Sequence, residues 1–351
     1  MQSNTISTQG RGVNVSAKIL RDKFYLTEMR KRFPDGVADR FESFRLKTHA
    51  EQMRTSTINY LRHLRQALRT TNEVKKNFKE RYFDLMEGKL ISIEMECIFD
   101  NKDTMPKQKD LGTFMVTMCD DGSIRTDADS EGTAEVKVTI SHNSPMRLKK
   151  VTDKLNQSGG GVNASCGMHI HLDQRDVSYL TASKRAKRLI KALPALKLLV
   201  APSRLGNNYC NENQPIRGDD TQYRHSSNRY RMVNFLPAYD EHKTIEVRLH
   251  GGTLDFWKIL GWINLCQFIS DCTEIDRIAL ENYRTANRSV PFNPYLQITI
   301  ENLIRIEKMP ESLRSYVWKR FRQFHPAKAN ELREKLSEEG KFHLTDGMAI
   351  S

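Results

Sequence analysis

Alternating apolar and polar residues mark the middle of the chain. Ile91, Ile93 and Met95 alternate with polar side chains, Glu94 and Glu96 among them. A period of two is typical of a β-strand that buries one face. Strands are predicted over residues 89–99, 111–118, 133–141, 165–173, 230–236 and 243–250.

Apolar residues spaced three or four apart predict helices around these strands. The stripes are Ile58, Leu61, Leu64 and Leu68, then Leu189, Leu193, Leu196 and Val200, then Leu313, Val317, Phe321 and Phe324. Pro194 lies within the second stripe, where proline is expected to kink a helix. Helices are predicted over residues 144–157, 178–201 and 254–270, and over most of the chain beyond them to about residue 338.

This order of elements predicts an α+β fold, with a curved, mainly antiparallel sheet that carries a site on its concave face. The polar stretch 203–228 is expected to be an active-site loop or lid. The predicted organisation is a disordered tail (1–15), a basic helical region (16–87), a central domain (88–275) and a helical C-terminal region packed on it (276–351).

The composition indicates a soluble, cytoplasmic protein without a membrane segment. Of the 351 residues 38% are hydrophobic, and no apolar run reaches the roughly 18 residues that span a bilayer. The N-terminus lacks the apolar stretch of a secretory signal. The six cysteines form no C-x-x-C pair, so we expect free thiols in a reducing compartment.

The net charge of +13 is concentrated at the N-terminus, where residues 1–90 hold 19 Lys and Arg against 10 Asp and Glu. We interpret the part of this region with the stripe Ile58, Leu61, Leu64 and Leu68 as an amphipathic helix docked on the central domain, with its basic face in solvent. Nucleic acid or an acidic partner is the alternative ligand for the basic face. No aromatic residues are interleaved with the basic ones as in RNA-binding segments, so nucleic acid is not expected as a partner.

Two histidines, His169 and His171, are two residues apart in a predicted strand and therefore share one face. They follow a loop rich in small residues that includes Gly159 and Gly167. Imidazoles beside such open backbone suit a metal or a phosphate. Cys166, three residues before His169, allows the alternative of a Cys–His nucleophile.

Two further same-face pairs strengthen this interpretation. Glu94 and Glu96 are either a solvated face or hard oxygen ligands for Mg²⁺ or Mn²⁺. Glu246 and Arg248 are either a surface ion pair or a metal ligand beside a phosphate-binding guanidinium. The presence of three such pairs in one chain favours a functional site.

These motifs, in this order, resemble the amidoligase family of the glutamine synthetase-like carboxylate–amine ligases. They are E-x-E at 94–96, D-G-S at 121–123, a further Glu, G-M-H-x-H at 167–171, N-R-x-x-x-x-N at 228–234 and E-x-R at 246–248. The resemblance covers roughly residues 88–270. It implies a glutamine synthetase-like fold with a curved, mainly antiparallel sheet flanked by helices.

The resemblance also implies a role for each matching residue. The metal ligands would be Glu94, Glu96, Glu135, His169 and Glu246. The groups that bind the nucleotide would be His171, Ser165, Gly167 and Arg231. Arg229 and Arg248 would hold the transferring phosphoryl group, and Asp121, with Ser123, would lie on the acceptor side.

Two of these assignments have rivals in the sequence. Relatives usually show Ser-Pro soon after the third Glu, but here Pro145 comes ten residues after Glu135, so Glu131 competes for that role. Arg204 and Arg231 compete for the role of Arg229.

The function implied by the resemblance is an ATP-dependent carboxylate–amine ligase that needs Mg²⁺ or Mn²⁺. Its substrates would be an amino acid, a peptide or a protein side chain together with an amine, and its oligomeric state is left open. A zinc hydrolase built on the H-x-H pair is one alternative. A non-catalytic protein that binds nucleic acid through the basic N-terminus is the other.

Overall fold

The computed structural model describes residues 89–112, 115–126, 128, 131–141, 145–206, 208–213, 229–238, 242–285 and 297–339. The expected tail (1–15) and the expected basic helical region (16–87) lie outside these ranges.

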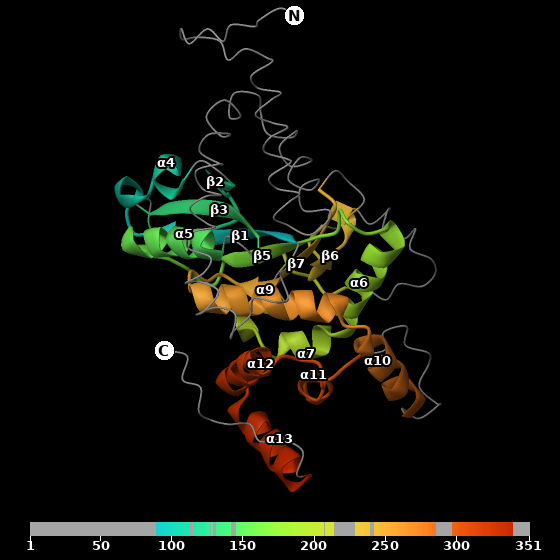
Figure 1. Cartoon of the computed structure of the whole chain (residues 1–351). Helices are drawn as coiled ribbons and strands as arrows, with labels where there is room; N and C mark the ends of the chain where they lie inside the picture. Colours follow the sequence, from blue (N-terminus) through green and yellow to red (C-terminus); the bar gives the residue numbers. More distant parts are fainter. Residues whose placement is uncertain are drawn as a thin grey trace, which may run out of the picture.

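An open sheet of seven antiparallel strands forms the centre of the molecule (Figure 1). The strands are β1 (Leu90–Phe99), β2 (Val116–Cys119), β3 (Gly132–Ser141), β4 (Gly160–Gly161), β5 (Gly167–Asp173), β6 (Val233–Asn234) and β7 (Thr244–Gly251). Their order is β2-β3-β1-β5-β7-β6, and β4 pairs with β1. The predicted mixed fold with an antiparallel sheet flanked by helices is therefore confirmed.

Two strands are shorter than predicted. The prediction of 111–118 is wrong before Val116, because the short helix α4 (Gln108–Leu111) precedes it and Met115 has a left-handed backbone with φ 57°. The predicted strand 230–236 contains only β6. Asn234 Oδ1 accepts the N–H of Leu236 and turns the chain into the 3₁₀ helix η4 (Leu236–Ala238).

The longer helices agree with the apolar spacing. They are α5 (Pro145–Gln157), α6 (Tyr179–Lys191), α9 (Phe256–Asp271), α10 (Glu274–Thr285), α12 (Glu311–Phe324) and α13 (Pro326–Glu338). The predicted helix 178–201 divides at Ala192 into α6 and α7 (Leu193–Lys197), because Pro194 has no N–H to continue the ladder. The remaining short elements are α11 (Ile300–Ile304), η2 (Lys102–Thr104) and η3 (Pro202–Arg204).

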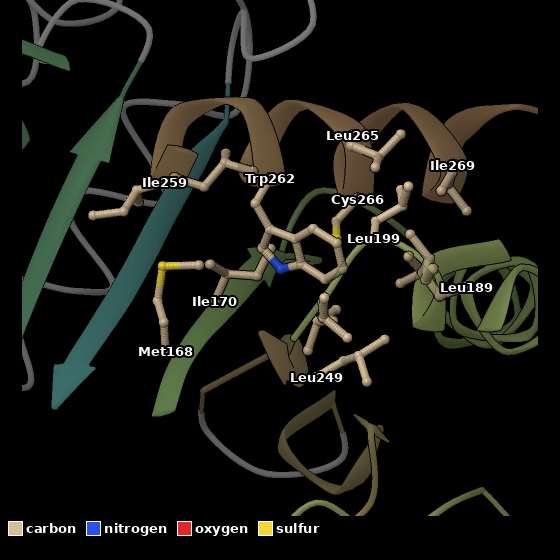
Figure 2. Close-up of a cluster of buried hydrophobic side chains, with 14 of the residues drawn as sticks. Met168, Ile170, Leu189, Leu199, Leu249, Ile259, Trp262, Leu265, Cys266 and Ile269 are labelled. Carbon is tan, nitrogen blue, oxygen red and sulfur yellow. The ribbon is translucent and has the colours of Figure 1, made fainter. Parts of the chain in front are cut away.

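Helices cover one face of the sheet. In Figure 1, α9 lies against the sheet, and α7, α11 and α12 lie beyond α9. Trp262 of α9 packs against Met168 and Ile170 of β5 and against Leu249 of β7, as Figure 2 shows. The next residues along these strands, such as His169 and Arg248, face the opposite way. The close-packed core therefore fixes the positions of the strands that carry the candidate functional residues.

Helix α9 is buried on nearly all sides, which explains its almost continuously apolar sequence. Asp255 caps its N-terminus by accepting hydrogen bonds from the N–H groups of Trp257 and Lys258. On the side away from the sheet, Tyr316 of α12 packs on Gly261, and its hydroxyl donates to the carbonyl of Lys258 at 3.2 Å. Within the described part of the chain, no helix has both the length and the apolar character required to cross a membrane.

Candidate functional site

Strand pairing brings the predicted site residues together on the face of the sheet opposite α9. Glu94 of β1 pairs with His169 of β5 on one side and with Lys137 of β3 on the other. His171 of β5 pairs in turn with Glu246 of β7. The antiparallel register thus sets groups that are 43 or 75 positions apart in sequence next to one another.

These side chains line a pocket of about 560 Å³. That volume lies within the usual range for small-molecule sites. The lining residues are Glu94, Glu96, Asp121, Ser123, Glu135, Lys137, Ser165, His169, His171, Arg204, Tyr209, Arg229, Tyr230, Asn234, Leu236, Pro237, His242, Glu246 and Arg248.

Glu94 lies at the centre of a hydrogen-bonded group. His169 Nδ1 lies 3.3 Å from Glu94 Oε2, and Lys137 Nζ donates to Oε1 at 2.8 Å. His171 Nε2 lies 3.5 Å from Oε1. Burial alone would raise the pKa of Glu94, but the two histidines and Lys137 more than offset it, so the pKa lies well below its usual range. Glu94 is therefore ionised.

The carboxylates around Lys137 and around His171 favour the charged form of each side chain. Lys137 Nζ also lies 2.9 Å from Glu135 Oε1. Although burial opposes it, Glu94 and Glu135 raise the pKa of Lys137, which rules out the lysine as a general base near neutral pH. Burial would lower the pKa of His171, but the nearby carboxylate of Glu94 and the charge of Glu246 raise it.

Glu246 forms a second anionic centre on β7. Arg248 Nη1 donates to its Oε1, and Asn234 Nδ2 donates to its Oε2 at 2.6 Å. Burial would raise the pKa of Glu246, but His171 and Arg248 lower it on balance. Glu246 is thus ionised beside an arginine that faces the same pocket.

Three arginines, Arg204, Arg229 and Arg248, also line the pocket. Arg204 is only 3% exposed, and its Nη2 donates to the carbonyl of Arg248 at 3.0 Å. Arg204 Nε has no hydrogen-bond partner, and no carboxylate among the described residues forms an ion pair with this guanidinium. A buried cation without an anionic partner is costly. Arg229 and Arg248 lie over the ring of Tyr230, at 5.1 and 5.6 Å from its centroid.

Carboxylates and imidazoles of the pocket fit a divalent cation. In each of three groups, the ligand atoms lie within 4.8 Å of one another: Glu94, Glu135 and His169; Glu94, His171 and Glu246; and Glu96, Asp121 and Glu135. Oxygen-rich sets of this kind suit Mg²⁺ and Mn²⁺. Glu135 belongs to two of the groups, whereas its rival Glu131 does not line the pocket.

Two predicted nucleotide-binding residues do not line the pocket. Gly167 lies beneath it, where its N–H donates to Glu96 Oε2 at 2.6 Å and orients that carboxylate. A Cβ at Gly167 would lie 2.5 Å from Arg204 Nη2, so glycine permits the arginine to approach. Arg231 Nη1 instead donates to the carbonyl of Glu212 at 2.6 Å.

Several pocket residues were missed by the motif analysis, notably Lys137, Asn234, Tyr209, Tyr230 and His242. Two of them had a signal in the sequence. Lys137 is two positions after Glu135 and so shares its face of the strand, and Asn234 ends the N-R-x-x-x-x-N motif. The tyrosines enter the pocket from irregular segments, for which periodicity gives no direction.

The cysteines are free thiols, as expected. Cys166 is buried, and burial raises its pKa, so it remains a thiol near neutral pH. This disfavours the Cys–His nucleophile, because only the thiolate attacks. A zinc site would need histidines beyond His169 and His171, and of the others His142 and His225 lie outside the described residues. His250 packs on Trp262 in the core, away from the pocket lining.

A comparison with protein families gives a match to the model of putative amidoligase enzymes. The match covers residues 50–217 and 211–270, which include every residue that lines the pocket. No curated protein matches the chain.

Proposed function

The chain belongs to the amidoligase family, and from that premise we propose that it is an ATP-dependent carboxylate–amine ligase that uses Mg²⁺ or Mn²⁺. The observation that carries the proposal is that one pocket holds two kinds of charged group. Carboxylates and imidazoles that suit a divalent cation lie beside arginines, of which Arg204 is buried without an anionic partner among the described residues. A nucleotide phosphate carried by a metal ion matches both kinds of group at once.

The reaction we propose has two steps. An oxygen of the substrate carboxylate bonds to the γ-phosphorus of ATP while the bond from that phosphorus to the β–γ bridging oxygen breaks, which gives an acyl phosphate and ADP. The amine nitrogen then bonds to the acyl carbon while the carbon–oxygen bond to phosphate breaks. The nitrogen loses a proton to solvent, and the products are an amide and inorganic phosphate.

The protein would contribute mainly position and charge, as in other phosphoryl transfers. Arg248 and Arg229 would hold the transferring group, since a guanidinium fork matches its oxygens. Glu94, Glu96, Glu135, His169 and Glu246 would hold the divalent cation, which when bound supplies charge neutralisation. Glu94 and Glu246 are ionised in the folded protein and can bind the cation without first losing a proton.

The test is ATP turnover by full-length protein with Mg²⁺ or Mn²⁺ against pools of amino acids and peptides, with ADP, phosphate and amide products read by mass spectrometry. Glu94→Ala is the site variant. Glu331→Ala, on the exposed side of α13, is the matched control. We expect pool-dependent ADP release in wild type and control that Glu94→Ala lacks, together with a product heavier by the joined amine.

The zinc hydrolase is the competing outcome of the same experiment. His242 joins His169 and His171 in the pocket lining, so a zinc site with several imidazoles is the second candidate. Failure of wild type to bind nucleotide, with tightly held zinc in the purified protein, would reject the ligase in favour of the hydrolase.

A further inference from the structure

Lys137 puts a positive charge among the side chains that suit a divalent cation. Its Nζ lies 2.8 Å from Glu94 Oε1 and 2.9 Å from Glu135 Oε1. These two carboxylates, together with His169, form one of the three possible metal groups. The ammonium therefore already contacts two of the three ligands of that group.

We propose that Lys137 is a resident cation that takes the place of a divalent ion between Glu94 and Glu135. Binding of an ion to Glu94, Glu135 and His169 would require the ammonium to leave, because the ion would share both carboxylates of this group with the ammonium and the two cations would repel each other strongly. The role of the metal ion in the reaction rests on the proposed function, whereas the competition between Lys137 and the ion does not.

Strand pairing holds Lys137 in this place. In the β1–β3 ladder Lys137 is directly opposite Glu94, and Glu135 is two residues before it on the same strand. All three side chains therefore rise from adjacent positions on one face of the sheet. The lysine reaches its carboxylates by the geometry of the sheet, and no loop has to fold over the pocket to bring it there.

The other two groups each share one carboxylate with Lys137, and of these the group formed by Glu96, Asp121 and Glu135 is the better position for a divalent ion, because Glu246 of the other group is already paired with Arg248. Among the described residues, no lysine or arginine forms an ion pair with Glu96 or Asp121. Backbone N–H groups orient both side chains, since Gly167 donates to Glu96 Oε2 and Ser123 donates to Asp121 Oδ1 at 2.7 Å. One oxygen of each carboxylate is thereby positioned while the other keeps its capacity to bind a cation.

The experiment counts Mn²⁺ ions bound per chain by electron paramagnetic resonance, with full-length protein and no nucleotide. Lys137→Met keeps the length of the side chain but removes its charge. We expect one more Mn²⁺ per chain in Lys137→Met than in wild type. Lys137→Arg, which restores a cation, and Lys149→Met, which breaks a surface pair with Asp153, should keep the wild-type number. An unchanged or smaller number in Lys137→Met overturns the proposal.

Thermal unfolding of the same proteins gives a second readout. Without Lys137, Glu94 and Glu135 repel each other until a cation returns. Mn²⁺ should therefore raise the Tm of Lys137→Met by several degrees more than that of wild type. If Lys137→Met fails to fold even with Mn²⁺ present, while Lys137→Arg folds, the ion cannot replace the lysine and the proposal is wrong.

The ion count and the turnover assay test the two proposals separately, so that either proposal can be rejected without the other. Mn²⁺ is counted without ATP or substrate, so a protein that lacks ligase activity can still gain an ion when Lys137 is replaced. Conversely, an active ligase whose Lys137→Met variant gains no ion would overturn only the role of the lysine.

Discussion

At the scale of single residues, Arg248 contacts both an anionic and an aromatic side chain of the pocket. Its Nη1 donates to Glu246, its Nε donates to the carbonyl of Tyr209 at 3.2 Å, and its guanidinium lies over the ring of Tyr230. A lysine ammonium can replace the charge but not this set of directed contacts. Replacing Arg248 by lysine thus tests whether the reaction needs the directed contacts of the guanidinium or only its positive charge.

We predict that Arg248→Lys lowers the rate of ADP formation by about 10²-fold or more, the magnitude typical of losing a directed charge-stabilising group. The rate is measured with saturating ATP and the substrate pool that stimulates wild type. Arg277→Lys, on the exposed surface of α10, is the control and should keep its rate. A rate for Arg248→Lys within about threefold of wild type would show that the charge suffices.

The sequence predicts the placement of a site residue well when a strand carries it and poorly when a turn does. Glu94, Glu96, His169 and His171 were grouped correctly, since a strand fixes the direction of alternate side chains. Arg204 remained only one of several candidates, because it comes from the 3₁₀ turn η3 and its place beside His169 depends on the tertiary fold.

At the scale of elements, the crossing of α9 and α12 depends on Gly261. A Cβ at Gly261 would lie 2.4 Å from two carbons of the Tyr316 ring, which is closer than real Cβ atoms approach. Tyr316 is 5% exposed and hydrogen-bonded to Lys258, so its ring has little room to move. The two helices would have to separate to admit even one methyl group.

We predict that Gly261→Ala lowers the free energy of unfolding by about 1–3 kcal/mol, the usual cost of overpacking, despite the better helix propensity of alanine. Chemical denaturation monitored by circular dichroism measures the change. Gly122→Ala is the matched control, because a Cβ there meets nothing within 4 Å. Equal stability of Gly261→Ala and wild type would mean that the helices adjust freely.

The elements themselves were predictable where one periodicity ran for many residues, as in β1, β3 and α12. Prediction failed where local backbone conformation decides. The left-handed Met115 delays β2, the side chain of Asn234 ends β6, and the two-residue strand β4 is too short to show any period. Hydrophobic patterning does not encode these features.

At the scale of the whole molecule, a buried histidine links stability to pH. His250 is 3% exposed beside Trp262, and its Nε2 has no hydrogen-bond partner. Burial, with the charge of Arg320, lowers the pKa of His250 to about 3. In the unfolded chain the imidazole binds a proton near pH 6.5, whereas in the folded chain it stays neutral at that pH. Stability is therefore lost as the pH falls from about 6.5 toward 3.

We predict that the free energy of unfolding falls by about 2 kcal/mol between pH 7 and pH 5 because of His250 alone. His250→Phe, which keeps an aromatic ring on Trp262 but cannot titrate, should lose correspondingly less over the same interval. Urea denaturation at the two pH values measures the difference. If both proteins lost the same free energy, His250 would have to be protonated in the folded state.

The sheet packs against the core with one face and lines the pocket with the other, which limits where the chain can gain or lose residues. One extra residue in β5 ahead of His169 would turn both imidazoles toward Trp262 and bring Ile170 into the pocket, so a single insertion would spoil core and chemistry together. A substitution harms one position, but an insertion inverts a whole strand. We expect tolerated insertions and deletions in this family to fall in the connections between strands, and new substrate preferences to arise there.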